Sequence, residues 1–147
     1  MTFVPELQAD LHLCSVSLAP KGGLEVVVRN VVENRTPSPV GRHHTDVMSY
    51  PTIFAPSQTF RISFARYITC SVGAEEYFLP DEYDIFEGRS FRRFTRSRFL
   101  DYLEKNTYGS DVRPGVRYHY GIYCLNELVN VVSSSAPNIS SLGDTAL

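Results

Sequence analysis

Apolar and polar residues alternate along the first part of the chain, which is the pattern of a β-strand with one buried face. The run 7–18 alternates in two phases, and a β-bulge near Leu13 accounts for the change of phase. The turn residues 19–23 follow, and residues 24–32 alternate again. Two alternating runs on either side of a short glycine-rich turn predict a β-hairpin.

The same period of two returns later in the chain. It predicts further strands over residues 60–72, 116–124 and 128–132. Residues 34–56 differ, because four prolines interrupt them and no long periodicity remains. We expect this segment to form a long surface loop, and loops of such length are often functional.

One segment has helical rather than strand-like spacing. Phe99, Leu100 and Leu103 fall on one side of a helix. A hydroxyl group at Thr95 or Ser97 would cap the first turn, because it accepts a hydrogen bond from an otherwise unpaired backbone N–H. We therefore predict one packed α-helix around residues 97–107.

Together these elements predict a mainly β fold. Regular alternation favours antiparallel pairing, so we expect a β-sandwich or a small β-barrel accompanied by the single helix. We predict one β-rich domain over residues 1–133. Residues 134–147 are small and polar, and we expect them to form a flexible carboxy-terminal tail.

Composition and charge narrow the class of protein. The 147 residues suffice for one domain, and their formal net charge of −2 argues against non-specific nucleic-acid binding by the whole chain. The amino-terminal segment resembles no secretory signal, and no apolar run has the length of about 18 residues that spans a membrane. Three separated cysteines without a CxxC pair fit a reduced protein. We expect a cytoplasmic protein that does not interact with membranes.

The densest chemical feature is GRSFRRFTRSRF, residues 88–99, which interleaves arginines with phenylalanines. One hypothesis is an anion or nucleic-acid site, because guanidinium groups bind phosphate and aromatic rings stack on bases. The competing hypothesis pairs the arginines with the six carboxylates of residues 75–87 across neighbouring strands. We favour the second, with one or two arginines left for a partner. The candidate residues are Arg89, Arg92, Arg93, Arg96 and Arg98.

A second candidate site lies in the long loop. His43 or His44 would serve as a general acid or base there, oriented by the carboxylate of Asp46. A metal site is disfavoured, because adjacent histidines on a strand point to opposite faces and no third ligand follows at a familiar spacing. We predict no metal and no cofactor.

A third candidate is the tyrosine-rich strand over residues 116–124. Tyr118 and Tyr120 share one face of this strand, and His119 and Tyr123 share the other. Aromatic residues at a period of two are explained more readily by core packing than by a ligand site. If the strand is a recognition surface, the three tyrosines would join the arginines as binding residues.

These residues support three functional hypotheses. The favoured one is a small binding protein, such as an inhibitor, an immunity-type protein or a regulatory subunit. It would contact a protein partner or another copy of itself through arginine and tyrosine side chains. The second is a small enzyme with a tyrosine- and histidine-lined cavity for a small molecule, in which His119 joins His43, His44 and Asp46. The third is binding of phosphate or nucleic acid by the arginine segment.

Overall fold

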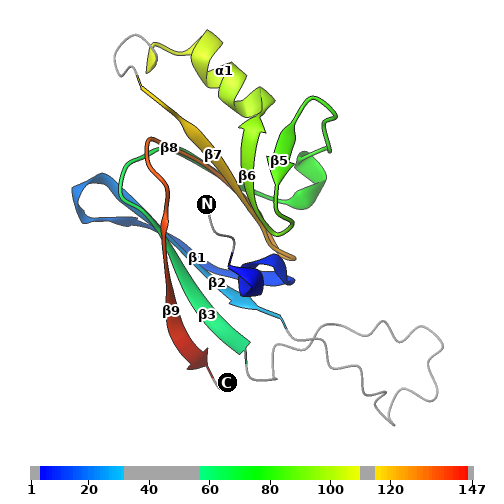
Figure 1. Cartoon of the computed structure of the whole chain (residues 1–147), viewed down its shortest axis with the longest axis vertical. Coiled ribbons are helices and arrows are strands. Elements are labelled where there is room, and N and C mark those ends of the chain that lie inside the picture. The colour runs from blue at the N-terminus through cyan, green and yellow to red at the C-terminus, as the bar shows by residue number, and fades with distance from the viewer. Residues whose placement is uncertain (1–3, 32–56, 110–114, 146–147) are drawn as a thin grey trace, which may run out of the picture.

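Two antiparallel sheets make up the protein (Figure 1). The computed structural model describes residues 4–31, 57–109 and 115–145. The four-stranded sheet has the order β1-β2-β3-β9. Its strands are β1 (Leu11–Ala19), β2 (Gly23–Asn30), β3 (Ser57–Phe64) and β9 (Asn138–Thr145).

The five-stranded sheet has the order β4-β8-β7-β6-β5. Its strands are β4 (Tyr67–Gly73), β5 (Ile85–Glu87), β6 (Phe91–Arg96), β7 (Tyr118–Tyr123) and β8 (Leu128–Ser133). The predicted mainly β, antiparallel sandwich is thereby confirmed. The alternative of a closed barrel is not realised, because the described strands form two separate sheets with free edges.

Two connections pass from one sheet to the other at the same corner of the sandwich. One joins β3 to β4, and the other joins β8 to β9. Ser63 of β3 is opposite Asn138 of β9 in one sheet, and Tyr67 of β4 is opposite Ser133 of β8 in the other. Between them, the backbone N–H of Ser134 donates to the carbonyl of Arg66 at 3.0 Å. Sandwiches turn such corners with strands that pass from one sheet to the other.

The predicted hairpin of β1 and β2 is confirmed, including its bulge. The register between the two strands shifts between Leu13 and Ser15. A short 3-10 turn, η2 (Pro20–Gly22), joins the strands. Lys21 has φ 65° and Gly22 has φ 82°, a left-handed backbone that glycine adopts without steric cost. This turn therefore presents Lys21 in a fixed place at one end of the sandwich.

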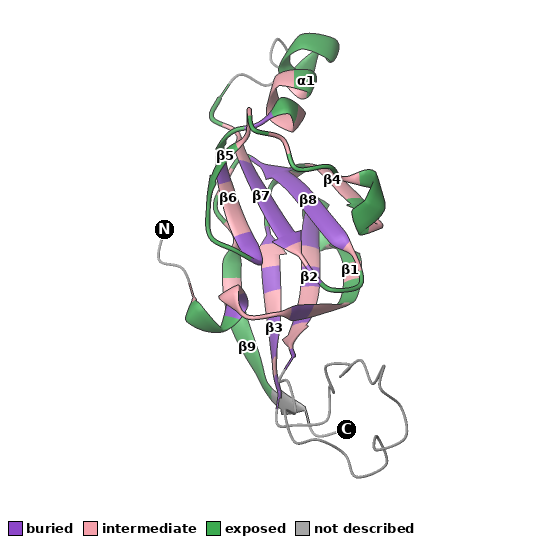
Figure 2. Ribbon diagram, turned by 90° about the vertical axis from the view of Figure 1, so that its right-hand side faces the viewer, coloured by how far each residue is buried: buried purple, intermediate pink, exposed green. Residues whose placement is uncertain are grey.

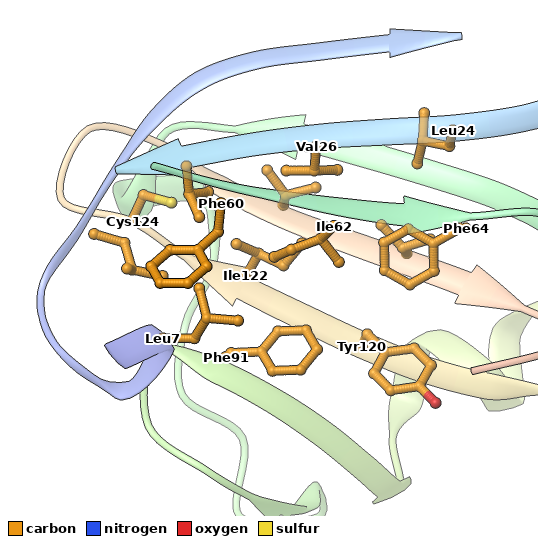
Figure 3. Packing of buried hydrophobic residues seen from close by; sticks show 14 residues of the cluster. Leu7, Leu24, Val26, Phe60, Ile62, Phe64, Phe91, Tyr120, Ile122 and Cys124 are labelled. Carbon is orange, nitrogen blue, oxygen red and sulfur yellow. The ribbon is translucent and has the colours of Figure 1, made fainter. Parts of the chain in front are cut away.

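The core fills the space between the sheets (Figure 3). Leu24 and Val26 of β2 face Tyr120 and Ile122 of β7, and all four are at most 2% exposed. The Phe91 ring stacks on the ring of Tyr120, with 6.0 Å between centroids. Burying side chains of this size contributes about 1.5–3 kcal/mol each, so this layer supplies most of the driving force for folding.

The helix α1 (Arg98–Asn106) confirms the helix prediction. Ser97 is its N-cap, and the Ser97 hydroxyl accepts a hydrogen bond from the backbone N–H of Leu100 at 3.1 Å. No residue of the helix is fully buried, and Phe99 and Leu103 are half-buried. The helix projects past the end of the five-stranded sheet (Figure 2), so it packs along one side only. It is too short and too polar to cross a membrane, and so are the short 3-10 turns in the described part of the chain.

The carboxy-terminal segment differs from the expectation of a flexible tail over 134–147. Residues Asn138–Thr145 form β9, which pairs with β3 along its length. Ile139 packs against the core. Backbone hydrogen bonds hold the strand, and they do not depend on an alternating apolar pattern. For that reason the apolar pattern of this serine-rich sequence did not predict the strand.

Candidate functional site

The outer face of the five-stranded sheet, turned away from the four-stranded sheet, carries a second layer of packed side chains. β4 and β5 are the two edges of this sheet, so their connection passes from one edge to the other. We call this connection, residues 74–84, the strap. Its Phe78 ring lies where a side chain on Gly73 would be, 2.8 Å from the position of a Cβ atom. The glycine thus makes room for one anchor of the strap.

An aromatic cluster lies beside the strap at the centre of this face. Phe94 of β6 and His119 of β7 are directly opposite in the register, and their rings stack with 4.0 Å between centroids. Phe99 of α1 lies 5.2 Å from the histidine ring, and Phe86 of β5 lies 5.3 Å from the ring of Phe94. His119 consequently joins the helix to the sheet and is only 2% exposed.

Both ring nitrogens of His119 have hydrogen-bond partners. Its Nε2 lies 2.8 Å from Oδ1 of Asn130, which also accepts from the hydroxyl of Tyr123 at 3.1 Å. Because that oxygen can only accept, Nε2 carries the proton. Nδ1 then accepts from the Ser97 hydroxyl, 2.8 Å away, which in turn caps the helix. The ring nitrogens of His119 and the hydroxyl groups of Ser97 and Tyr123 are thus hydrogen-bonded, as buried polar groups usually are.

Burial sets the protonation state of His119. It lowers the pKa of the imidazole from 6.5 to about 4, against a smaller opposing effect of the hydrogen bond to Asn130. The histidine is therefore neutral near pH 7. A buried, neutral imidazole with both nitrogens engaged has a clear structural role, whereas the catalytic role considered for it stays an untested prediction.

The two tyrosines predicted to line a cavity with His119 face away from it. Tyr118 and Tyr120 face the inside of the sandwich, and Tyr120 is 1% exposed. His119 and Tyr123 face the outside, because successive side chains of a strand point to opposite faces. Burial also raises the pKa of the Cys124 thiol to about 12, which disfavours a thiolate nucleophile. The cavity that would combine Tyr118, Tyr120 and His119 does not form.

His43, His44 and Asp46 lie outside the described residues. Within the described ranges, no group of three or more His, Cys, Asp or Glu side chains is placed to hold a metal ion.

The separation of His119 from Tyr118 and Tyr120 follows from the strand alternation alone, because neighbours on a strand point to opposite faces. The sequence pattern was thus sufficient to exclude a cavity shared by all three side chains.

The arginines of the 88–99 segment make contacts within the protein. Arg89 forms an ion pair with Asp10, with 2.8 Å between Nη2 and Oδ1, and donates to the carbonyl of Gln8. The Arg92 guanidinium lies between two rings, 4.3 Å from the centroid of Phe86 and 4.4 Å from that of Tyr123. Contacts of this kind fix the side chains and leave them less available to a ligand.

The last two arginines of the segment hold the far end of the strap. The Arg96 and Arg98 guanidinium groups lie 4.5 and 4.6 Å from the ring of Tyr83. Arg98 also forms an ion pair with Asp81. The backbone N–H of Tyr83 and the Arg98 guanidinium hold the pKa of Asp81 below its ordinary value. The Tyr83 hydroxyl donates to Asp101 of α1, which raises the pKa of the phenol.

Arg93 is the remaining member of the segment. It is directly opposite Glu87 in the pairing of β5 with β6. Opposite charges in such cross-strand positions stabilise a sheet by a few tenths of a kcal/mol to about 1 kcal/mol. Of the five arginines, Arg98 forms an ion pair with a preceding acid, whereas Arg89 pairs with Asp10 and both Arg92 and Arg96 lie over aromatic rings. The hypothesis that the segment balances the acids of residues 75–87 stays a prediction, and so does a binding role for it.

A cleft of about 760 Å³ lies between the strap and the outer face of the sheet, and we call it the outer cleft. Arg89 and Arg92 are the cations among its described lining residues. The carboxylates that line it are Asp10, Glu75, Asp81, Glu82 and Asp84. The outer cleft therefore has a net negative lining, although it lies against the most arginine-rich part of the sequence.

Large apolar side chains surround the outer cleft and are exposed. Tyr77 and Leu79 of the strap are 85% and 86% exposed. Leu125 and Phe86 on its other sides are also exposed. None of these four was among the candidate residues predicted from the sequence. The signal that could have found them is the apolar run Tyr77-Phe78-Leu79 inside an otherwise acidic segment.

Comparisons with family models, with curated proteins and with solved structures find no match to this chain. The site must therefore be interpreted from its own chemistry.

Proposed function

We propose that this is a non-catalytic binding protein whose outer cleft receives a segment of a partner protein. The observation that carries the proposal is the exposure of Leu79, which lines the outer cleft, and of Tyr77, two positions before it in the strap. Contiguous apolar surface of this kind, rimmed by polar residues, is typical of protein interaction sites.

The strap presents these side chains in a defined way. Phe78 points in and packs at Gly73, so its neighbours on either side, Tyr77 and Leu79, point out. At the far end, Tyr83 is held by Arg96 and Arg98. Anchoring both ends lowers the conformational entropy that binding would otherwise cost. An exposed tyrosine on an anchored segment is suited to be a binding hot spot, and the exposed leucine beside it adds apolar area for a partner to bury.

The charge of the outer cleft indicates the chemistry of the partner. Asp10 and Asp81 form ion pairs with arginines, which leaves three further carboxylates against Arg92 in the lining. This balance favours a segment that carries cationic residues between apolar ones. The same balance disfavours a nucleic acid in this cleft, because phosphates would meet unpaired carboxylates. No observation on the described residues favours an enzyme.

The test is affinity capture with tagged wild-type protein and two variants, followed by native mass determination. We expect Tyr77→Ser combined with Leu79→Ser to weaken capture of a cation-rich partner by more than about tenfold, because hot-spot truncations cost about 2 kcal/mol or more. Leu18→Ser is the matched control, since Leu18 is 73% exposed on β1 of the other sheet.

Equal capture by the wild type and the double variant would contradict the proposal. So would loss of capture in the Leu18→Ser control. A native mass that corresponds to two copies of the chain, and that reverts to one copy in the double variant, would show that the strap serves self-association and would replace the partner proposed here.

A further inference from the structure

A second cleft, of about 530 Å³, lies at one end of the sandwich and shares no lining residue with the outer cleft. Three segments that are distant in the sequence meet there: the β1–β2 turn, the β3–β4 turn and the residues that lead into β7. Each contributes one cation to the lining, namely Lys21, Arg66 and Arg117. The β1–β2 turn and the connection between β8 and β9 lie on this side of the molecule (Figure 1). We call this the basic cleft.

The described residues that line the basic cleft have a net positive charge. None of its described lining residues is an aspartate or a glutamate. Lys21 and Arg66 bring two positive charges to one half-enclosed cleft, where they repel one another and raise the local electrostatic potential. A bound anion would relieve that repulsion, whereas in the outer cleft carboxylates already surround the arginines.

The backbone around the basic cleft leaves room for a ligand. Gly22 and Gly115 both line it, with φ 82° and 145°. A Cβ atom built on either glycine would have no heavy atom of the described residues within 4 Å, so these residues leave space beside each backbone. Loops at one end of a rigid sandwich commonly carry binding residues in this way.

The fold uses the backbone of Arg66 and leaves its guanidinium to solvent. The Arg66 carbonyl accepts hydrogen bonds from the Ser134 N–H at 3.0 Å and from the Ser133 hydroxyl at 3.1 Å. The next residue, Tyr67, packs against the core. The position of Arg66 is thereby fixed at the corner of the sandwich, while its side chain is exposed.

We propose that the basic cleft binds a phosphorylated small molecule. Arginine matches the geometry of phosphate oxygens with paired N–H groups, and lysine adds a compact point charge. A volume of about 530 Å³ is within the range of small-ligand sites. The charges of Lys21 and Arg66 suit one or two phosphate groups, whereas an extended nucleic acid needs a longer positive track than this cleft offers. The inference does not depend on the proposed protein partner.

The test is a titration of isotopically labelled protein with sodium pyrophosphate, observed by amide NMR shifts at constant ionic strength. We expect saturable shifts of the Gly22, Gly115 and Ser134 amides. Lys21→Gln and Arg66→Gln should each weaken binding about tenfold, because each removes a charge-assisted contact. Lys105→Gln on α1 removes one exposed charge elsewhere and should change the affinity less than about twofold.

Several results would overturn the inference. One is the absence of saturable shifts up to about 10 mM pyrophosphate, which is weaker than any specific site of this kind. Another is an equal loss of affinity in Lys105→Gln, because the binding would then reflect overall charge. In a parallel titration, binding of a ten-nucleotide single-stranded DNA at the same amides more tightly than pyrophosphate would assign the cleft to nucleic acid instead.

Discussion

The outer cleft and the basic cleft differ in how the charges that line them are spaced along the sequence. The outer cleft lies against five arginines that are close together in the chain, yet carboxylates dominate its lining. The basic cleft is made by three cations separated by tens of residues, with no described acid among them. A dense run of one charge in a sequence is therefore a poor guide to surface charge, because the fold places carboxylates of the strap and Asp10 beside it.

The two regions also differ in how firmly their polar groups are held. Around the outer cleft, His119, Asn130, Ser97 and Tyr123 form a connected network beneath the strap. At the basic cleft, the Arg66 side chain is exposed and its position depends on its backbone alone. We therefore expect substitutions within this buried network to change stability, and substitutions in the basic cleft to change pyrophosphate binding.

The largest expected effect is a pH dependence of stability that originates on the outer face. His119 is neutral in the folded protein down to about pH 4, whereas in the unfolded chain it gains a proton near pH 6.5. The unfolded state binds more protons between these values, so the free energy of unfolding falls as the pH falls from about 6.5 to 4. The loss approaches about 3 kcal/mol.

Urea denaturation at pH steps between 7 and 4 measures this loss. His119→Gln keeps a polar side chain but removes the titration, so its stability should fall less steeply than that of the wild type over the same range. Arg66→Gln in the basic cleft should keep the wild-type slope. If the free energy of unfolding falls with pH equally steeply in the wild type and in His119→Gln, His119 is not the source of the pH dependence.

A smaller effect is expected from crowding the outer face with a single methyl group. A Cβ atom at Gly121 would lie 2.9 Å from the Tyr123 ring and 3.0 Å from the Phe94 ring. Gly121→Ala should therefore lower the free energy of unfolding by about 1–3 kcal/mol, as overpacking does. The measurement is the midpoint of urea denaturation at pH 7.

Gly109→Ala is the matched control, because a Cβ atom there would approach only the exposed Thr107 side chain. It should change stability by less than about 0.5 kcal/mol. If Gly121→Ala is equally harmless, the rings beside Gly121 are packed more loosely than their stacking indicates.

The smallest effect should come from the arginine segment itself. Arg89 is paired with Asp10 at a partly exposed site, and such pairs contribute less than about 1 kcal/mol. Arg89→Gln should therefore cost little stability and leave the affinity for pyrophosphate unchanged. Calorimetric titration of this variant with pyrophosphate measures whether Arg89 contributes to the affinity for the anion. A tenfold loss of pyrophosphate affinity in Arg89→Gln would place the anion site in the arginine segment instead.

Much of the architecture was predictable from local pattern. Alternation identified β1, β2, β7 and β8, and a hydroxyl before an apolar run identified the start of α1. Alternation did not predict strand β9, because the strand is held by backbone pairing to β3 and has few apolar residues. The sequence did not predict the outer cleft, because the strap that forms one of its walls shows neither the helical nor the strand periodicity of apolar residues.

Periodicity and capping residues determined by themselves that the chain forms antiparallel strands and one helix, because both depend on neighbours a few positions away. The structure decided which charges meet. Asp10 reaches Arg89, and Lys21, Arg66 and Arg117 converge, only after strands distant in the sequence have paired. Electrostatic interactions act through space and weaken steeply with distance, so the chemistry of both clefts became defined only in the folded protein.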